Sequence, residues 1–160
     1  MRSRAQGPSI FIKNQKVDSY MLEIKEEVYN SVNIKVETPD GRMFVTIMEG
    51  KDGKPFKILV NIGKSGRALA AWADGLAEFI SLSLQNIGLD PTIKNLIGHK
   101  SDKYALQRNE DGVTVVHSGP DGIAHALVRY RADKYHRLLR SFGVSPDEND
   151  EDYFRPANSA

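Results

Sequence analysis

Cysteine is absent from the 160-residue sequence. Its absence excludes disulfide bonds, zinc sites built on thiolates and catalysis by a thiol nucleophile. No apolar run approaches the roughly 20 residues that a membrane-spanning helix needs. The basic start of the chain, Met1 to Pro8, is not followed by the apolar core of a secretory signal. We therefore expect a cytoplasmic protein without a membrane partner.

Motifs for catalysis and metal binding are missing as well. The sequence contains no Gly-x-Ser-x-Gly elbow, no His-Glu-x-x-His helix and no dinucleotide-binding glycine pattern. Four histidines are present, at spacings that are not typical of a zinc site: His99, His117, His125 and His136. We predict that the chain is not an enzyme, has no catalytic residues, and carries no metal ion or cofactor.

The composition is that of an ordinary globular domain, with 40% hydrophobic and 27% charged residues. The net charge of +1 indicates no partner by itself. The length suits a single domain with a sizeable core. Residues 1–8 are predicted to be mobile, residues 9–144 to form one α+β domain, and residues 145–160 to form a disordered acidic tail.

Alternating hydrophobic and polar residues predict consecutive β-strands in the first part of the chain. The pattern is clear over Val32–Glu37, Met43–Met48 and Phe56–Ile62, and Ser9–Ile12 and Tyr20–Ile24 are weaker candidates. Turns rich in Gly, Pro and Asp separate the clear runs. The strands should therefore form an antiparallel meander of three to four strands.

Two long helices are expected to pack on one face of this sheet. The first, Arg67–Asn86, carries an apolar stripe centred on Trp72 and Phe79, which should face the core. Gly75 in the middle of this helix indicates a close approach of another backbone. The second long helix begins at Pro120 and ends near Ser141.

Shorter elements are expected between the two long helices. Asp90 should cap a short helix whose first turn contains Pro91. The polar segment His99–Gly112 is predicted to be a loop, and Val113–Val116 to be a short strand.

Several segments share a family resemblance. Phe44–Gly66 reads FVTIMEGKDGKPFKILVNIGKSG, Phe79–Pro91 reads FISLSLQNIGLDP, and the last helix begins at His117-Ser118-Gly119-Pro120-Asp121. In this order they resemble the C-terminal region of adenosylcobalamin-dependent (class II) ribonucleotide reductases, whose domain is named for a Thr-Ser-Cys-Pro-Asp signature.

The resemblance covers Thr38 to Leu127, within a domain core of about residues 38–140. It implies a stand-alone relative with an origin in nucleotide metabolism. It implies no catalytic residue, since Gly119 stands where the signature has cysteine and the chain has no other thiol.

The turn between the third clear strand and the first long helix is a candidate anion site. Lys64, Ser65, Gly66 and Arg67 surround a helix N-terminus, where free N–H groups and the helix dipole favour phosphate. The turn is not a Walker A loop, because Ile58 occupies the position of that motif's first glycine. An ordinary turn with a capping serine is the alternative.

Arginine is concentrated on the last helix, where Arg129, His136, Arg137 and Arg140 share one face. The apolar residues on or near the other side are Ile123, Leu127, Tyr130 and Leu138. A basic face suits the phosphates of a nucleotide or a nucleic acid. It equally suits the acidic tail as an intramolecular partner, or simple solvation.

The start of the last helix, Ser118–Gly122, offers free N–H groups too, but Asp121 adds a negative charge there. We interpret this segment as a capped helix start. His125, which lies among apolar neighbours, is interpreted as a packed helix residue.

These patterns predict a non-catalytic binding module for a nucleotide or another anionic ligand. One alternative is a phage-encoded sponge or inhibitor that sequesters a nucleotide immune signal. Another is a protein- or DNA-interaction module that uses the basic helix and the acidic tail. Surplus apolar positions such as Val45 and Ile47 predict a homo-oligomer, most simply a dimer.

Overall fold

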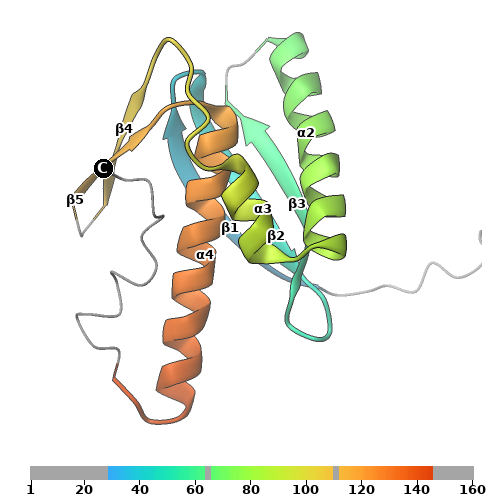
Figure 1. Ribbon diagram of the computed structural model, residues 1–160, viewed down its shortest axis with the longest axis vertical. Helices are drawn as coiled ribbons and strands as arrows, with labels where there is room; N and C mark the ends of the chain where they lie inside the picture. The colour runs from blue at the N-terminus through green and yellow to red at the C-terminus, as the bar shows by residue number, and fades with distance from the viewer. Residues whose placement is uncertain (1–28, 64–65, 110–111, 146–160) are drawn as a thin grey trace, which may run out of the picture.

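The computed structural model describes residues 29–63, 66–109 and 112–145. The predicted strands Ser9–Ile12 and Tyr20–Ile24, the residues Lys64 and Ser65, and the acidic tail from residue 146 lie outside this part. The described elements are β1 (Asn30–Thr38), β2 (Gly41–Glu49), β3 (Pro55–Ile62), α2 (Arg67–Asn86), α3 (Leu89–Leu96), β4 (Ala105–Asn109), β5 (Gly112–Val116) and α4 (Gly119–Ser141) (Figure 1).

The strands β1, β2 and β3 form the antiparallel meander that the alternation predicted. The turn between β1 and β2 needs Gly41, whose φ of 123° is in the region that side chains disfavour. Thr38 closes this turn by donating its hydroxyl to the Gly41 carbonyl at 2.7 Å. The α+β prediction, with an antiparallel sheet and covering helices, is confirmed.

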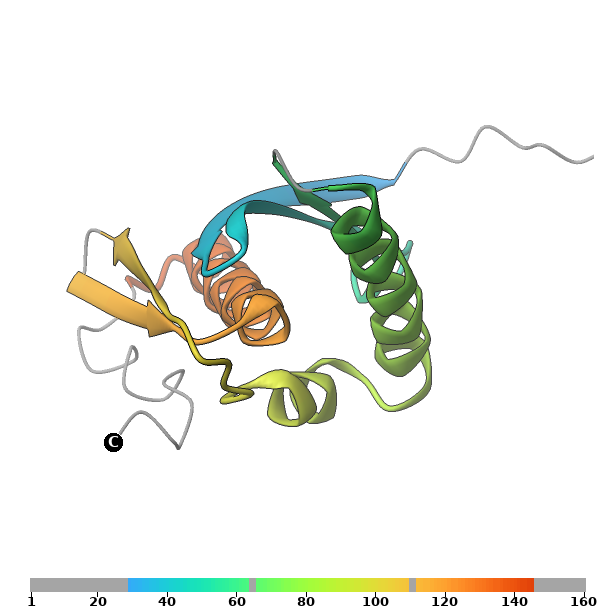
Figure 2. The ribbon, with the colours of Figure 1, turned by 90° about the horizontal axis from the view of Figure 1, so that it is seen from above.

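The described helices lie on the concave side of this sheet (Figure 2). Alternate residues of each strand point into the core, and Met43, Val45 and Ile47 of β2 are fully buried. The prediction that Val45 and Ile47 form a dimer surface is therefore wrong. Both side chains lie in the middle of the core, because β2 is the central strand.

Helix α2 approaches β3 through its small residues. Ala73, Ala77 and Ser81 are buried and recur every four positions, so the helix axis can come close to the strand. The Ser81 hydroxyl accepts a hydrogen bond from the Ile58 N–H at 3.0 Å, and Gln85 donates to the Phe56 carbonyl, also at 3.0 Å. The helix thus satisfies backbone groups on the free edge of β3.

The predicted core stripe of α2 is wrong at its two aromatic positions. Trp72 is 78% exposed and Phe79 is 74% exposed, so neither contributes to the core. The interpretation of Gly75 is wrong too, since no other described part of the protein lies within 4 Å of a Cβ built there. The helix packs by Ile80 and Leu84 together with its small residues, which carry no strong apolar signal.

The short helix α3 has Gly88 as its N-cap, not Asp90 as predicted. Asp90 lies inside the first turn, where its Oδ1 accepts a hydrogen bond from Arg131 of α4. The carboxylate therefore holds two helices together and does not cap its own.

Helix α4 matches its predicted bounds and buries Ile123, Leu127 and Tyr130 against the sheet. Gly122 permits this contact, since a Cβ there would lie 2.9 Å from a methyl carbon of Thr38. Leu138, predicted near the apolar side, is 55% exposed. The helix extends past the sheet at its C-terminal end, so its last turns have little to pack against (Figure 1).

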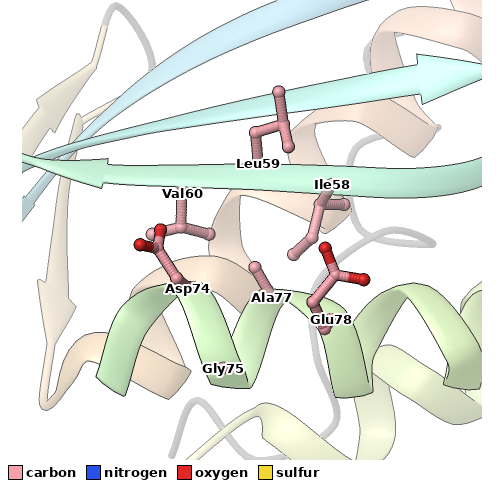
Figure 3. A pocket seen from close by; sticks show the side chains of 7 residues that line it. All are labelled: Ile58, Leu59, Val60, Asp74, Gly75, Ala77 and Glu78. Atoms are coloured by element: carbon pink, nitrogen blue, oxygen red, sulfur yellow. The ribbon is translucent and has the colours of Figure 1, made fainter. Parts of the chain in front are cut away.

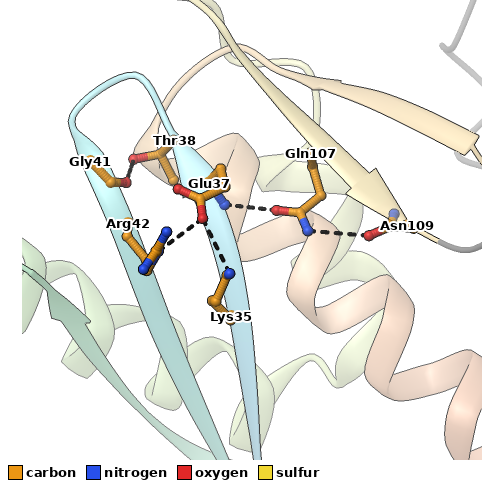
Figure 4. A network of polar contacts seen from close by, with 7 residues as sticks. All are labelled: Lys35, Glu37, Thr38, Gly41, Arg42, Gln107 and Asn109. Atoms are coloured by element: carbon orange, nitrogen blue, oxygen red, sulfur yellow. Dashed lines mark hydrogen bonds and ion pairs between the residues drawn. The ribbon is translucent and has the colours of Figure 1, made fainter.

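The predicted loop His99–Gly112 contains the strand β4, which pairs with β5 in a separate two-stranded sheet. The prediction of a strand at β5 is confirmed. Gln107 of β4 accepts a hydrogen bond from the Glu37 N–H at 2.8 Å and donates to Asn109 (Figure 4). This contact joins the hairpin to the edge of β1 and explains why a polar segment adopts strand structure.

Candidate functional site

The N-terminus of α4 is held by side chains that surround it. Ser118 is the N-cap, and its hydroxyl accepts a hydrogen bond from the Asp121 N–H at 3.2 Å and donates to the His99 carbonyl at 2.6 Å. Pro120 occupies the first turn, where a missing N–H does no harm. The interpretation of this segment as a capped helix start is confirmed.

Asp121 is 1% exposed and connects three segments of the chain. One carboxylate oxygen accepts from the Gly98 N–H at 2.7 Å, and the other accepts from the His117 N–H at 2.9 Å. The carboxylate therefore fixes the end of α3 and the end of β5 to the start of α4. Its oxygens are occupied by the protein itself, so this helix start is not available as an anion site.

His125 lies one turn after Asp121, with its Nε2 atom 3.6 Å from an Asp121 oxygen. Burial lowers the pKa of His125 below its usual value of 6.5, the Asp121 carboxylate opposes that shift, and His117 adds to it. Burial has the largest effect. The prediction that His125 is a packed residue is confirmed.

We expect the free energy of unfolding to fall as the pH drops below about 6.5. The unfolded imidazole binds a proton near that pH, whereas the folded His125 stays neutral down to its lower pKa. The stability that neutral His125 contributes is complete above the pKa of the unfolded imidazole. It is lost as the pH falls toward the lower pKa of the folded imidazole. Urea denaturation across this range should show a weaker pH dependence in His125→Gln, while the exposed His99→Gln should behave like the wild type.

Glu49 of β2 lies beside α4 and takes part in a compact polar cluster. It accepts hydrogen bonds from the Tyr130 hydroxyl at 2.6 Å and from Lys134 at 3.2 Å. Burial acts to raise the pKa of Glu49, but these two hydrogen bonds outweigh it, and the pKa lies below its usual value. Burial, and then the adjacent Glu49, raise the pKa of Tyr130. The cluster holds α4 on the sheet. Within it the charge of Lys134 is paired with the carboxylate of Glu49.

Most cations near the sheet are paired in the same way. Lys35 and Arg42 both contact Glu37, at 3.4 and 2.9 Å (Figure 4). The hydrogen bond from Arg42 is the main cause of the lowered pKa of Glu37. Lys57 lies 3.6 Å from Glu78. These side chains are partly neutralised and make weak candidates for an anionic ligand.

The predicted basic residues of α4 differ from these cations. Arg129, Arg137 and Arg140 are exposed, and no described carboxylate forms a salt bridge with any of them. Arg137 donates weakly to the Asp133 carbonyl at 3.4 Å and contributes to the low pKa of Glu49. His136 is half-buried on the same face, and its Nε2 atom has no hydrogen-bond partner among the described residues.

The other predicted anion site is only partly described. Gly66 is the N-cap of α2 without a side-chain hydrogen bond, and the first turn contains no acidic residue. Lys64 and Ser65 lie outside the described residues, and for Arg67 only the backbone is described. The start of α2 and the C-terminal half of α4 lie at opposite ends of the molecule (Figure 1) and on different sides of it (Figure 2). The structure therefore does not bring the start of α2 and the C-terminal half of α4 into one site.

Two hollows of the described part lie away from the arginines of α4. A groove between β3 and α2 is lined by Ile58, Leu59, Val60, Asp74, Gly75, Ala77 and Glu78 (Figure 3). A second, wider hollow on the convex face of the sheet shares Leu59, Val60 and Asp74 with the first. Neither is lined by a basic residue. The groove between β3 and α2 offers only carboxylates and apolar side chains, and the exposed arginines of α4 line neither hollow.

The described ranges contain neither a metal-binding cluster nor a membrane-spanning helix. No three His, Asp or Glu side chains there are grouped as metal ligands would be. None of the helices in residues 29–63, 66–109 and 112–145 is long and apolar enough to cross a bilayer.

The family model for the TSCPD domain matches residues 18–131. The chain belongs to the TSCPD domain family. Searches of curated proteins and of solved structures find no match. In this TSCPD domain the signature is matched at Ser118, Pro120 and Asp121. Ser118 caps helix α4, Pro120 lies in its first turn, and Asp121 is a buried hydrogen-bond acceptor.

The signature cysteine is replaced by Gly119, and this replacement is not forced by packing. The nearest described atom to a Cβ built at Gly119 is an oxygen of Asp40 at 3.9 Å, which is ordinary contact distance. A Cβ would fit at this position. The TSCPD domain described here therefore keeps the architecture of the signature without its thiol.

Proposed function

We propose that this TSCPD domain is a non-catalytic, ribonucleotide reductase-related binding module that takes a phosphate-bearing ligand of the nucleotide class on α4. One observation supports this most strongly: Arg129, Arg137 and Arg140 are exposed on one helix face and have no salt bridge among the described residues. The other Lys and Arg side chains of α4 have carboxylate partners, Asp90 for Arg131 and Glu49 for Lys134.

The chemistry of arginine agrees with such a ligand. The planar guanidinium group presents donors in a fixed fork that matches phosphate oxygens. Arg129 and Arg140 are 11 positions apart in the sequence, which is roughly 16 Å along a helix. The exposed Asp133 lies on the same face and separates the arginines of the row. A row of that length and spacing suits the separate phosphates of an oligonucleotide better than those of a mononucleotide.

The proposal is tested with the double variant Arg137→Gln/Arg140→Gln at low salt. Fluorescence anisotropy should show at least about a tenfold weaker affinity for a labelled single-stranded oligonucleotide, because charge-assisted hydrogen bonds contribute roughly 1.5–3 kcal/mol each. The salt dependence of binding should also fall, by about 0.7 in slope for each phosphate that the variant no longer neutralises. Calorimetry with mononucleotides tests the smaller ligand on the same variant.

The matched control is Lys35→Gln/Arg42→Gln, which removes two cations that share Glu37 as a salt-bridge partner. Its affinity should stay near that of the wild type. If both double variants weakened binding equally, the loss of net positive charge alone would explain the effect. That result would contradict a site on α4. The absence of any binding to oligonucleotides and mononucleotides would contradict the proposal as a whole.

A further inference from the structure

The outward face of α2 is apolar, although it belongs to a surface helix. Trp72, Phe79 and Leu82 are 78%, 74% and 53% exposed. With Gly75 they fall within about 80° of arc at 100° per residue. Surface helices normally place charged residues opposite the core. Exposed aromatic residues gathered on one face are typical of an interaction surface.

This face also lacks charge. The acidic residues in the middle of α2, Asp74 and Glu78, line the groove toward β3 (Figure 3), and Glu78 contacts Lys57. A basic or acidic partner would thus find no complementary side chain on the outward face. A membrane-binding helix carries Lys or Arg beside its apolar face, whereas the flank of α2 is acidic. An uncharged, apolar protein surface is the partner that fits.

Gly75 gives the face its shape. It lies between Trp72 and Phe79 along the helix, and no other described part of the protein lies within 4 Å of a Cβ built there. The helix backbone is therefore accessible between two exposed rings. A gap of this kind lets a second helix approach closely and receive a bulky side chain.

We propose that a second copy of this chain occupies the face, as a two-fold symmetric dimer with antiparallel α2 helices. A two-fold axis near Gly75 places Trp72 of each protomer against Phe79 of its partner, because those residues are almost equally distant from the axis in sequence. The surface is then complementary to itself. The proposed homodimer interface therefore lies on α2 and not at Val45 and Ile47, which are buried in the core.

The exposed area suits a weak dimer. A fully exposed aromatic side chain can bury roughly 150–250 Å². Because Trp72 and Phe79 are 78% and 74% exposed, the four rings of two copies supply about 450–750 Å². Leu82, which is 53% exposed, adds aliphatic area from both copies. The sum stays below about 1,200 Å², in the range of weak, concentration-dependent interfaces. The surface is separate from the arginine face of α4, so the dimer does not depend on the proposed ligand.

Sedimentation equilibrium of the full chain, from low micromolar to near-millimolar concentration, tests the dimer. The wild type should self-associate to a dimer, and Phe79→Glu should weaken this at least about 30-fold, the effect expected for one interface hot spot. Trp72 is the only tryptophan in the sequence. Its emission should therefore shift to shorter wavelength as the wild-type dimer forms, and stay unshifted in Phe79→Glu.

Two further variants make the result specific. Gly75→Leu adds bulk in open space, so the monomer should stay folded by circular dichroism while self-association weakens. Leu59→Glu introduces the same charge as Phe79→Glu at a half-exposed position on the sheet, and should remain dimeric. A wild type that stays monomeric at the highest concentration would overturn the proposal. A dimer that Leu59→Glu disrupts and Phe79→Glu does not would overturn it equally.

Discussion

Replacing Asp121 with alanine is expected to lower the free energy of unfolding by about 3–5 kcal/mol. The substitution removes two charge-assisted hydrogen bonds, from the N–H groups of Gly98 and His117. It leaves both donors without their acceptor in a place where Asp121 itself was 1% exposed. Urea denaturation, followed by circular dichroism near neutral pH, measures the change.

Asp121→Asn is the matched control for this variant. The amide keeps the size and one carbonyl acceptor, so its stability should lie between those of the wild type and of the alanine variant. A decrease below about 1 kcal/mol in Asp121→Ala, close to the range of ordinary surface substitutions, would show that this carboxylate does not hold the three segments together.

Replacing Tyr130 with alanine should destabilise the protein by a similar amount, about 3–5 kcal/mol. Tyr130 is the largest fully buried side chain of the described residues, and its removal leaves a cavity under α4. The change also removes the hydroxyl that donates to Glu49 at 2.6 Å. Thermal and urea denaturation should both report the destabilisation.

Tyr130→Phe separates the ring from the hydroxyl. It keeps the packing and removes only the hydrogen bond to Glu49, which Lys134 still contacts. We expect a destabilisation of about 1–2 kcal/mol. Equal destabilisation by Phe and Ala would contradict this account, since it would assign the whole effect to the hydroxyl.

The sheet could be predicted from the sequence because each strand buries only one face. Burial on one face enforces alternation, as in Ile34 and Val36 of β1 or Ile58 and Val60 of β3. Glycine and proline then marked the turns. Strand β4 was missed since its place in the fold depends on Gln107 reaching Glu37, a contact between residues 70 positions apart in sequence.

Helix α2 shows why two aromatic residues of a correctly predicted helix were placed inward. Large apolar residues such as Trp72 and Phe79 give the strongest periodic signal, and that signal does not distinguish a core from an interface. The buried side is marked by Ala73, Ala77 and Ser81, together with Ile80 and Leu84. Their spacing of four residues was present in the sequence and is the signal that identifies the contact with β3.

The candidate site was predictable in part. Helical spacing alone places Arg129, Arg137 and Arg140 on one face, and the structure shows all three exposed. These three arginines have no salt bridges among the described residues, whereas Lys134 and Arg131 do. The difference depends on which loops and strands come near α4. Such long-range contacts leave no local pattern in the sequence.

The hydrogen bonds from α2 to the edge of β3 have a consequence for how copies of this chain can assemble. The Ile58 amide and the Phe56 carbonyl already have intramolecular partners, Ser81 and Gln85. At these positions a foreign strand finds no unsatisfied backbone to pair with, which works against fibril-like growth from this border. Side chains of the covering helix α2, and not these two backbone groups, are what this border presents to another copy. A surface of side chains can close into a finite assembly, whereas an open strand edge can add strands without limit.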